Sequence, residues 1–264
     1  MAGRTREKKK AGDYVNLTIQ FYADKLPTAY RLMMVSIIKQ CLRIADDSTY
    51  KKYYEYNRPK PFVFSVFLQD YKFGASEILL SGFRLNLSSS DYDFIVPFLN
   101  GLQRTTQFQY KGYSVRRGLI RYGREVRIRS SRIIVTTNSP ILVEDENHTP
   151  LEPGSETYNA HLNRIADRIS VSLRGRALDR ELRMEPISVK KAVIKEKNEA
   201  FTQAADVGKT SGEYLFFTAY KGKFLLEGHP QDLQWLLETG IGLRSSQGFG
   251  HIQLEREVMM RNEA

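Results

Sequence analysis

The order in which strand-like and helix-like patterns follow one another constrains the fold of this chain most. Residues 14–23 (YVNLTIQFYA) alternate apolar and polar side chains, as a strand with one buried face does. After Pro27 and Thr28 the apolar residues follow the helical period to about Ala45. The first half is then completed by strands over Phe62–Leu68 and Glu77–Ser88, a helix over Asp91–Leu102, and a strand or hairpin over Thr106–Ile120.

This succession of strand, helix, strand, strand, helix and strand is the ferredoxin-like βαββαβ arrangement. A second, looser copy follows it, so the chain is predicted to be an α+β protein of two tandem ferredoxin-like halves. The elements expected in the second copy are strands over Val126–Val135 and Ser139–Val143, a helix over Glu156–Leu173, a strand over Ile187–Ile194, a hairpin over Glu213–Leu226 that turns at Lys221-Gly-Lys223, a helix over Pro230–Thr239 and a last strand over His251–Val258.

A chain of 264 residues is long enough for two small domains. We expect residues 1–13 to be a flexible basic arm, residues 14–122 to form the N-terminal domain and residues 123–264 the C-terminal domain. The single cysteine, Cys41, rules out an internal disulfide and favours a reducing compartment. The sequence has neither an apolar run long enough to span a membrane nor the apolar core of a signal peptide, so a cytoplasmic location with no membrane association is expected.

The basic residues are concentrated in one stretch. The net charge is +10, and between positions 111 and 132 there is only one acidic residue, Glu125. Arginine suits bidentate phosphate contacts, and the interleaved tyrosines can stack on unpaired bases. A merely solvated strand face is the alternative interpretation. We therefore predict RNA contacts from Arg116, Arg117, Arg121, Arg124, Arg127 and Arg129.

A glycine-rich segment, GIGLRSSQGFG, occupies residues 240–250 just before the last predicted strand. Glycines allow positive φ and close backbone approach, and successive N–H groups in such a turn can bind an anion. Neither a Walker loop nor a Rossmann fingerprint fits, because no Gly-Lys-Ser/Thr follows and the segment leads into a strand. A long turn that needs glycine for geometry alone is the alternative. The RNA-binding candidates here are Gly240, Gly242, Arg244, Ser245, Ser246, Gln247, Gly248 and Gly250.

This segment resembles the signature of the CRISPR-associated endoribonucleases that process precursor CRISPR RNA, the sixth numbered Cas family within the repeat-associated mysterious protein superfamily. The segments Leu26–Tyr30, Ser36–Lys39 and Pro59–Ser65 support the resemblance, which spans nearly the whole chain. It implies two ferredoxin-like halves, a role in antiviral defence, and CRISPR repeat RNA as the ligand. Other Cas subunits would be further partners, and the protein would be a monomer or homodimer.

The resemblance also implies metal-independent cleavage, in which a 2′-OH attacks the adjacent phosphate and leaves a 2′,3′-cyclic phosphate and a 5′-OH. The family usually places a histidine shortly before the strand that follows Lys60, but here that position holds Tyr54. Lys60 matches the family lysine, and Tyr30 is a candidate for the helix tyrosine, although Val35 is an alternative alignment. Neither a cofactor nor a metal is expected, because the carboxylates and histidines lack metal-ligand spacing.

Three interpretations stay open at this point. Tyr54, Lys60 and Arg244 could promote cleavage by aligning the 2′-OH and stabilising charge. One of the four histidines, His148, His161, His229 or His251, could reach the site from elsewhere. Alternatively, the protein is a noncatalytic repeat-RNA-binding subunit of a CRISPR interference complex. A ferredoxin-like RNA-binding protein outside CRISPR systems is a more distant possibility.

Overall fold

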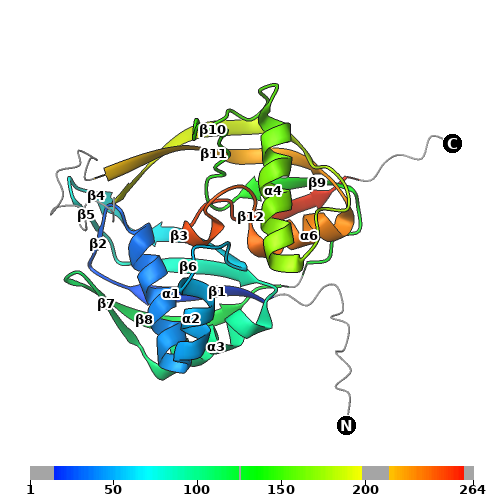
Figure 1. Cartoon of the computed structure of the whole chain (residues 1–264). Coiled ribbons are helices and arrows are strands. Elements are labelled where there is room, and N and C mark those ends of the chain that lie inside the picture. The colour runs from blue at the N-terminus through cyan, green and yellow to red at the C-terminus, as the bar shows by residue number, and fades with distance from the viewer. Residues whose placement is uncertain (1–14, 125, 198–213, 259–264) are drawn as a thin grey trace, which may run out of the picture.

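The computed structural model describes residues 15–124, 126–197 and 214–258. The expected basic arm at residues 1–13 lies outside these ranges. The described chain contains three antiparallel sheets, two of them large. The two large sheets lie in different halves of the molecule (Figure 1), and each has its own apolar core.

The first large sheet has the strand order β3-β6-β1-β8-β7. Helices α1 (Arg31–Ala45) and α3 (Tyr92–Arg104) pack on one of its faces, where Leu17, Ile19 and Phe21 point into the core. Because β8, β1, β6 and β3 lie side by side in that order, this half is ferredoxin-like, as predicted. The strands are β1 (Val15–Tyr22), β3 (Phe62–Gln69), β6 (Gly82–Ser89), β7 (Gln107–Tyr110) and β8 (Tyr113–Tyr122).

Three details of this half differ from the expectation. Helix α1 begins at Arg31 rather than Thr28, because Lys25–Pro27 (β2) pairs with Glu77–Leu79 (β5) in a small sheet that also holds β4 (Lys72–Phe73). The strand expected over Glu77–Ser88 is therefore split into β5 and β6. An unexpected helix, α2 (Asp47–Tyr54), begins where the Asp46 carboxylate accepts hydrogen bonds from the Ser48 and Thr49 amides.

The second large sheet has the order β10-β11-β9-β12, which repeats the strand pattern of the first. Helices α4 (Tyr158–Arg174) and α6 (Pro230–Thr239) supply Leu162, Ile165, Leu233 and Leu236 to its core. The predicted pair of ferredoxin-like halves is therefore confirmed. The strands are β9 (Arg132–Thr137), β10 (Arg183–Lys197), β11 (Tyr214–Glu227) and β12 (Ile252–Glu257).

The hairpin predicted within Glu213–Leu226 is wrong. Strand β11 runs straight through Gly222 and pairs along its length with β10, which is one residue longer, so the two form one extended ribbon (Figure 1). Gly222 is needed because a Cβ there would lie 2.0 Å from the Ser188 carbonyl oxygen, at the register shift of β10. Strand β9 starts only at Arg132, and Ser139–Val143 contributes an isolated bridge, Ile141 to Tyr220, rather than a strand.

The two halves meet where α6 and the glycine-rich segment contact β3 and β6. The Ser88 hydroxyl donates a hydrogen bond to the Leu237 carbonyl at 3.3 Å, and the His251 ring lies 2.9 Å from the Ser65 hydroxyl. None of the described helices is both long and apolar enough to cross a membrane.

Candidate RNA-binding and catalytic site

The glycine-rich segment is a tightly packed loop. All four of its glycines have positive φ values, and its two intervening apolar residues, Ile241 and Phe249, are fully buried. A Cβ at Gly250 would lie 1.9 Å from the Ile241 carbonyl oxygen, and one at Gly240 would lie 2.8 Å from Val63 of the first half. The glycines therefore allow the loop to fold on itself and to dock against β3.

The backbone amides of this loop are largely used inside the protein. Gly240 donates to Leu236, Gly248 to Ser245 and Gly250 to Pro140, at 2.8–3.1 Å. These three N–H groups are consequently not available as the anion cradle that the sequence suggested. The polar tip of the loop is the part that faces outward, with Arg244 exposed and Ser245–Gln247 (η2) half-buried in one turn of 3-10 helix.

Two arginines lie at this tip. The Arg244 guanidinium lies over the Phe217 ring at 4.4 Å and donates a 2.9 Å hydrogen bond to Gln247 Oε1. The Arg31 guanidinium, at the start of α1, lies near the rings of both Tyr30 and Phe249, at 5.2 and 5.3 Å. The loop therefore brings cations from both halves of the chain to one place.

The residues predicted for catalysis are only partly brought together. Lys60 Nζ lies 5.4 Å from the centre of the Tyr54 ring, at the end of α2, and Lys39 Nζ of α1 lies 4.9 Å from the same ring. Tyr30 caps α1 nine residues before Lys39, which corresponds to about 13 Å along the helix axis. Tyr30 is therefore associated with Arg31 and the glycine-rich loop, whereas Tyr54 is flanked by two lysines.

Tyr54 is a poor candidate for a general base. Its hydroxyl is buried and, within the described part of the chain, has no hydrogen-bond partner. Burial raises the pKa of Tyr54 above its usual value, and the neighbouring Tyr50 raises it further. The nearby lysines therefore do not lower this pKa, and the Tyr54 phenolate is inaccessible at neutral pH.

The pKa of Lys60 is shifted in the opposite direction to that of Tyr54. Its ammonium donates hydrogen bonds to the Arg58 and Tyr56 carbonyl oxygens, at 2.6 and 3.4 Å. Partial burial lowers the pKa of Lys60, and the cations Arg58 and Lys39 lower it further. A lysine with a lowered pKa gives up its proton more readily, which suits an acid for a leaving oxygen.

None of the four histidines is placed to act at Tyr54. His251 is buried between the halves, and burial lowers its pKa to about 4. His148 lies in an exposed turn beside Glu144, His161 contacts Arg164, and His229 caps α6 beside Asp179. Rescue of the missing family histidine by one of these residues is therefore not supported.

The arginine-rich stretch lies on β8 and on the segment that comes directly after this strand. The Arg116 guanidinium lies over the Tyr22 ring at 4.8 Å, whereas Arg117 donates to the Gly118 and Thr105 carbonyl oxygens. Arg117 is therefore half-buried and already engaged with the backbone. The exposed members of the stretch are Arg116, Arg121, Arg124, Arg127 and Arg129.

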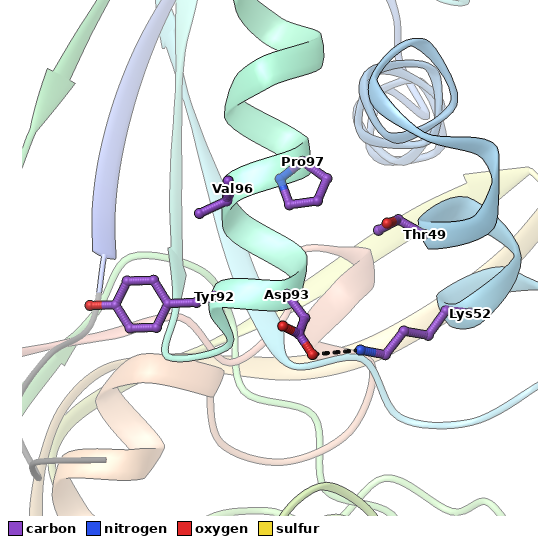
Figure 2. Close-up of a pocket in the computed structure, with 6 residues that line it drawn as sticks. All are labelled: Thr49, Lys52, Tyr92, Asp93, Val96 and Pro97. Carbon is purple, nitrogen blue, oxygen red and sulfur yellow. Dashed lines mark hydrogen bonds and ion pairs between the residues drawn. The ribbon is translucent and has the colours of Figure 1, made fainter. Parts of the chain in front are cut away.

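Two other features of the described chain are weaker candidates for a functional site. Asp179, His229 and Asp232 place possible metal ligands within 4.8 Å of one another, but Asp232 already pairs with Arg174 at 2.9 Å and with Arg176 at 3.6 Å. These arginines neutralise the carboxylate and disfavour a cation there. Figure 2 shows a shallow depression between α2 and α3, where Lys52 pairs with Asp93 at 2.9 Å.

The family model for the C-terminal part of the CRISPR-associated protein Cas6 matches residues 123–254, which is half of the chain. This chain belongs to the Cas6 family. A search of curated protein sequences gave no match.

Solved Cas6 structures share the fold over nearly the whole chain. A Cas6-related protein from Pyrococcus furiosus superposes with a TM-score of 0.76 at 17% identity, covering 93% of this chain and 100% of its own. A RAMP protein described as binding different RNA substrates has a TM-score of 0.71 at 18% identity, covering 92% and 100%. A Cas6 product complex has a TM-score of 0.59 at 14% identity, with the same coverages of 92% and 100%.

Sequence reasoning missed three residues that the structure adds to this region: Lys39, Arg31 and Glu196. Lys39 belongs to a segment that carried the family resemblance, so its position was a usable signal. Arg31 and Glu196 are 165 residues apart and meet only because β10 reaches α1. No spacing in the sequence could have indicated that contact.

Proposed function

We propose that this Cas6 protein binds CRISPR repeat RNA and cleaves precursor CRISPR RNA within the repeat, without a metal ion. The observation that carries the proposal is the position of Lys39 and Lys60, whose ammonium nitrogens flank the same ring where the family usually has its histidine. Two cations at this point can stabilise the extra negative charge of a phosphorane. The RNA-binding part is supported by family membership, the exposed arginines and the related RAMP protein described as binding RNA.

The proposed reaction begins with attack of a ribose 2′-oxygen on the adjacent phosphorus. The 2′-OH proton passes to solvent, since the Tyr54 hydroxyl is buried and none of the four histidines is placed to act there. The bond from phosphorus to the 5′-oxygen then breaks, and the protonated Lys60 ammonium donates its proton to that oxygen. The products are a 2′,3′-cyclic phosphate and a 5′-OH. Because one of the two proton transfers lacks a dedicated group, we expect slow turnover.

In this scheme Tyr54 has a different role from the one that the sequence suggested. Its ring lies next to both ammonium groups, and its buried hydroxyl does not contact the RNA. Tyr30 acts at the glycine-rich loop, where its ring lies against Arg31. The contacts proposed for RNA phosphates are made by Arg244 and by Arg116, Arg121, Arg124, Arg127 and Arg129. Arg117 supports the strand rather than the RNA.

A second candidate function is a noncatalytic repeat-RNA-binding subunit of a CRISPR interference complex. The observation that favours it is the buried Tyr54 hydroxyl, which leaves the usual histidine position without a titrating group. Both candidates predict repeat-RNA binding, so only product formation separates them.

The test incubates the full-length protein with end-labelled repeat RNA in EDTA and analyses the products. We expect one cut within the repeat, a 2′,3′-cyclic phosphate on the upstream fragment, and no cut when the ribose at that position is 2′-deoxy. Tight binding without any product, at protein in excess over RNA, would overturn cleavage and leave the noncatalytic function. No binding to repeat RNA would overturn both.

A further inference from the structure

A buried carboxylate lies between the two arginines of the glycine-rich loop region. Glu196 of β10 is 7% exposed, and its Oε1 lies 3.4 Å from Arg31 Nη1. Its other oxygen, Oε2, is buried and has no hydrogen-bond partner within the described part of the chain. Arg244 is close enough to influence the charge of Glu196 from the loop side.

This ion pair lacks the geometry of a purely structural one. Buried arginine–carboxylate pairs normally form two short parallel hydrogen bonds, which offset the cost of removing both charges from water. Here the contact between Arg31 and Glu196 is single and long, and the bond from Arg31 Nε to the Gly248 carbonyl oxygen is also 3.4 Å. Both charged groups therefore keep unused hydrogen-bonding capacity in a place that is almost closed to water.

The surroundings of Arg31 favour an oxyanion of tetrahedral shape. Its guanidinium lies near the rings of Tyr30 and Phe249, which hold it in place without using its N–H donors. Arg244 adds a second, exposed guanidinium that is oriented by Gln247. Two pre-oriented guanidinium groups suit a phosphate, which presents several acceptor oxygens, better than a single carboxylate.

We propose that Arg31 and Arg244 form a phosphate site for the bound RNA, at which the Glu196 carboxylate is the resident anion that a phosphodiester displaces. This inference rests on the proposed RNA-binding function and deepens it. The phosphodiester enters from the side of the exposed Arg244 and takes over the donors of Arg31. Glu196 then takes up a proton from solvent, which removes its repulsion for the phosphate.

Proton uptake by Glu196 is physically easy at this position. Burial raises the pKa of its carboxyl to about 7, even though Arg31 and Arg244 both act to lower it. A phosphate on those arginines raises this pKa further, because it neutralises the cations and adds negative charge. The charged groups that act on Glu196 are Arg31 from α1 and Arg244 from the loop. Affinity for RNA should therefore increase as the pH falls from 8 to 6.

The test compares repeat-RNA dissociation constants of the full chain at pH 6 and pH 8. We expect Glu196→Gln, which mimics the protonated carboxyl, to bind about fivefold tighter than wild type at pH 8, with the gap closing at pH 6. Glu185→Gln is the matched control, because Glu185 lies on the same strand, is only half-buried, and pairs with Arg183. It corrects for the loss of any one negative charge. The double variant Arg31→Gln/Glu196→Gln should lose the gain.

The result that overturns the site is Glu196→Gln binding no tighter than Glu185→Gln, or more weakly than wild type. If Glu196→Gln does not fold, as judged by its melting curve, the wild-type protein decides: an affinity for repeat RNA that does not increase between pH 8 and pH 6 also overturns the site. Failure of wild-type protein to bind repeat RNA at either pH would instead overturn the proposed function.

Discussion

The imidazole of His251 and the hydroxyl of Ser65 meet at 2.9 Å across the boundary between the two ferredoxin-like halves. Ser65 lies on β3, and His251 directly follows Gly250, the last glycine of the loop. The His251 amide also donates to the Ser139 hydroxyl at 2.9 Å. The histidine that follows the family's loop is therefore a structural residue that joins the two halves.

The burial of His251 makes the stability of the fold dependent on pH. Burial lowers the pKa of His251 from 6.5 to about 4, so between these pH values the unfolded chain binds a proton that the folded chain does not. The stabilising contribution is present above pH 6.5 and is lost as the pH falls towards 4, by up to about 3 kcal/mol. Urea unfolding between pH 7.5 and 4.5 measures it. His251→Gln should lose this part of the slope, and an unchanged slope in that variant would contradict the assignment.

The adjacent residues Tyr53 and Tyr54 should differ in how their replacement by phenylalanine changes the free energy of unfolding. The Tyr53 hydroxyl donates to Asp91 at 3.0 Å, whereas the Tyr54 hydroxyl is buried without a partner. Tyr53→Phe should lower the free energy of unfolding by about 1 kcal/mol, and Tyr54→Phe should leave it equal or higher. Tyr54→Phe should also keep the RNA cleavage rate within about twofold of wild type. Much slower cleavage by Tyr54→Phe would show that the Tyr54 hydroxyl takes part in the reaction.

Two glycines with similar φ values should respond very differently to replacement by alanine. Gly250 has φ 68° and would place a Cβ 1.9 Å from the Ile241 carbonyl oxygen, whereas Gly175 has φ 72° and open space around it. Gly175→Ala should cost about 1 kcal/mol from the left-handed backbone alone. Gly250→Ala should cost more than about 3 kcal/mol, because the loop cannot close on itself. Thermal unfolding compares them, and equal costs would show that packing does not fix the loop.

The exposed arginines of β8 should contribute to RNA affinity through phosphate contacts. Arg116→Ala and Arg121→Ala should each weaken repeat-RNA binding and reduce the slope of log affinity against log salt by about one. Arg183→Ala is the control, because Arg183 is exposed but already paired with Glu185 on β10. Equal salt slopes in all three variants would place the RNA on another face.

The fold followed from the sequence wherever periodicity was strong. Both βαββαβ halves are confirmed, because their strands alternate over many residues and their helices carry continuous apolar faces. The errors arose at Gly222, which serves a register shift inside a long ribbon and not a turn, and at α2, whose mixed Thr, Tyr and Lys composition hides its period. Local patterns could not indicate either feature.

The site was less predictable than the fold, for a physical reason. Tyr54 and Lys60 were found because the family resemblance places a histidine and a lysine at these positions, but the buried state of the Tyr54 hydroxyl depends on packing that only the structure shows. The glycine-rich loop was identified, yet the use of its amides within the protein depends on Pro140 and Leu236, which no motif links to it. Arg31 and Glu196 depend on how the two halves sit together.

In the proposed mechanism a lysine pair, rather than a histidine, supports metal-independent cleavage. The most direct measurement is the single-turnover cleavage rate of repeat RNA in EDTA for Lys39→Met and Lys60→Met. Lys52→Met is the control, since Lys52 lies on α2 near Tyr54 in sequence but is paired with Asp93. We predict a loss of about 10²-fold for Lys39→Met and Lys60→Met, unchanged binding, and a wild-type rate for Lys52→Met. Wild-type rates in all three variants would show that neither Lys39 nor Lys60 supports cleavage.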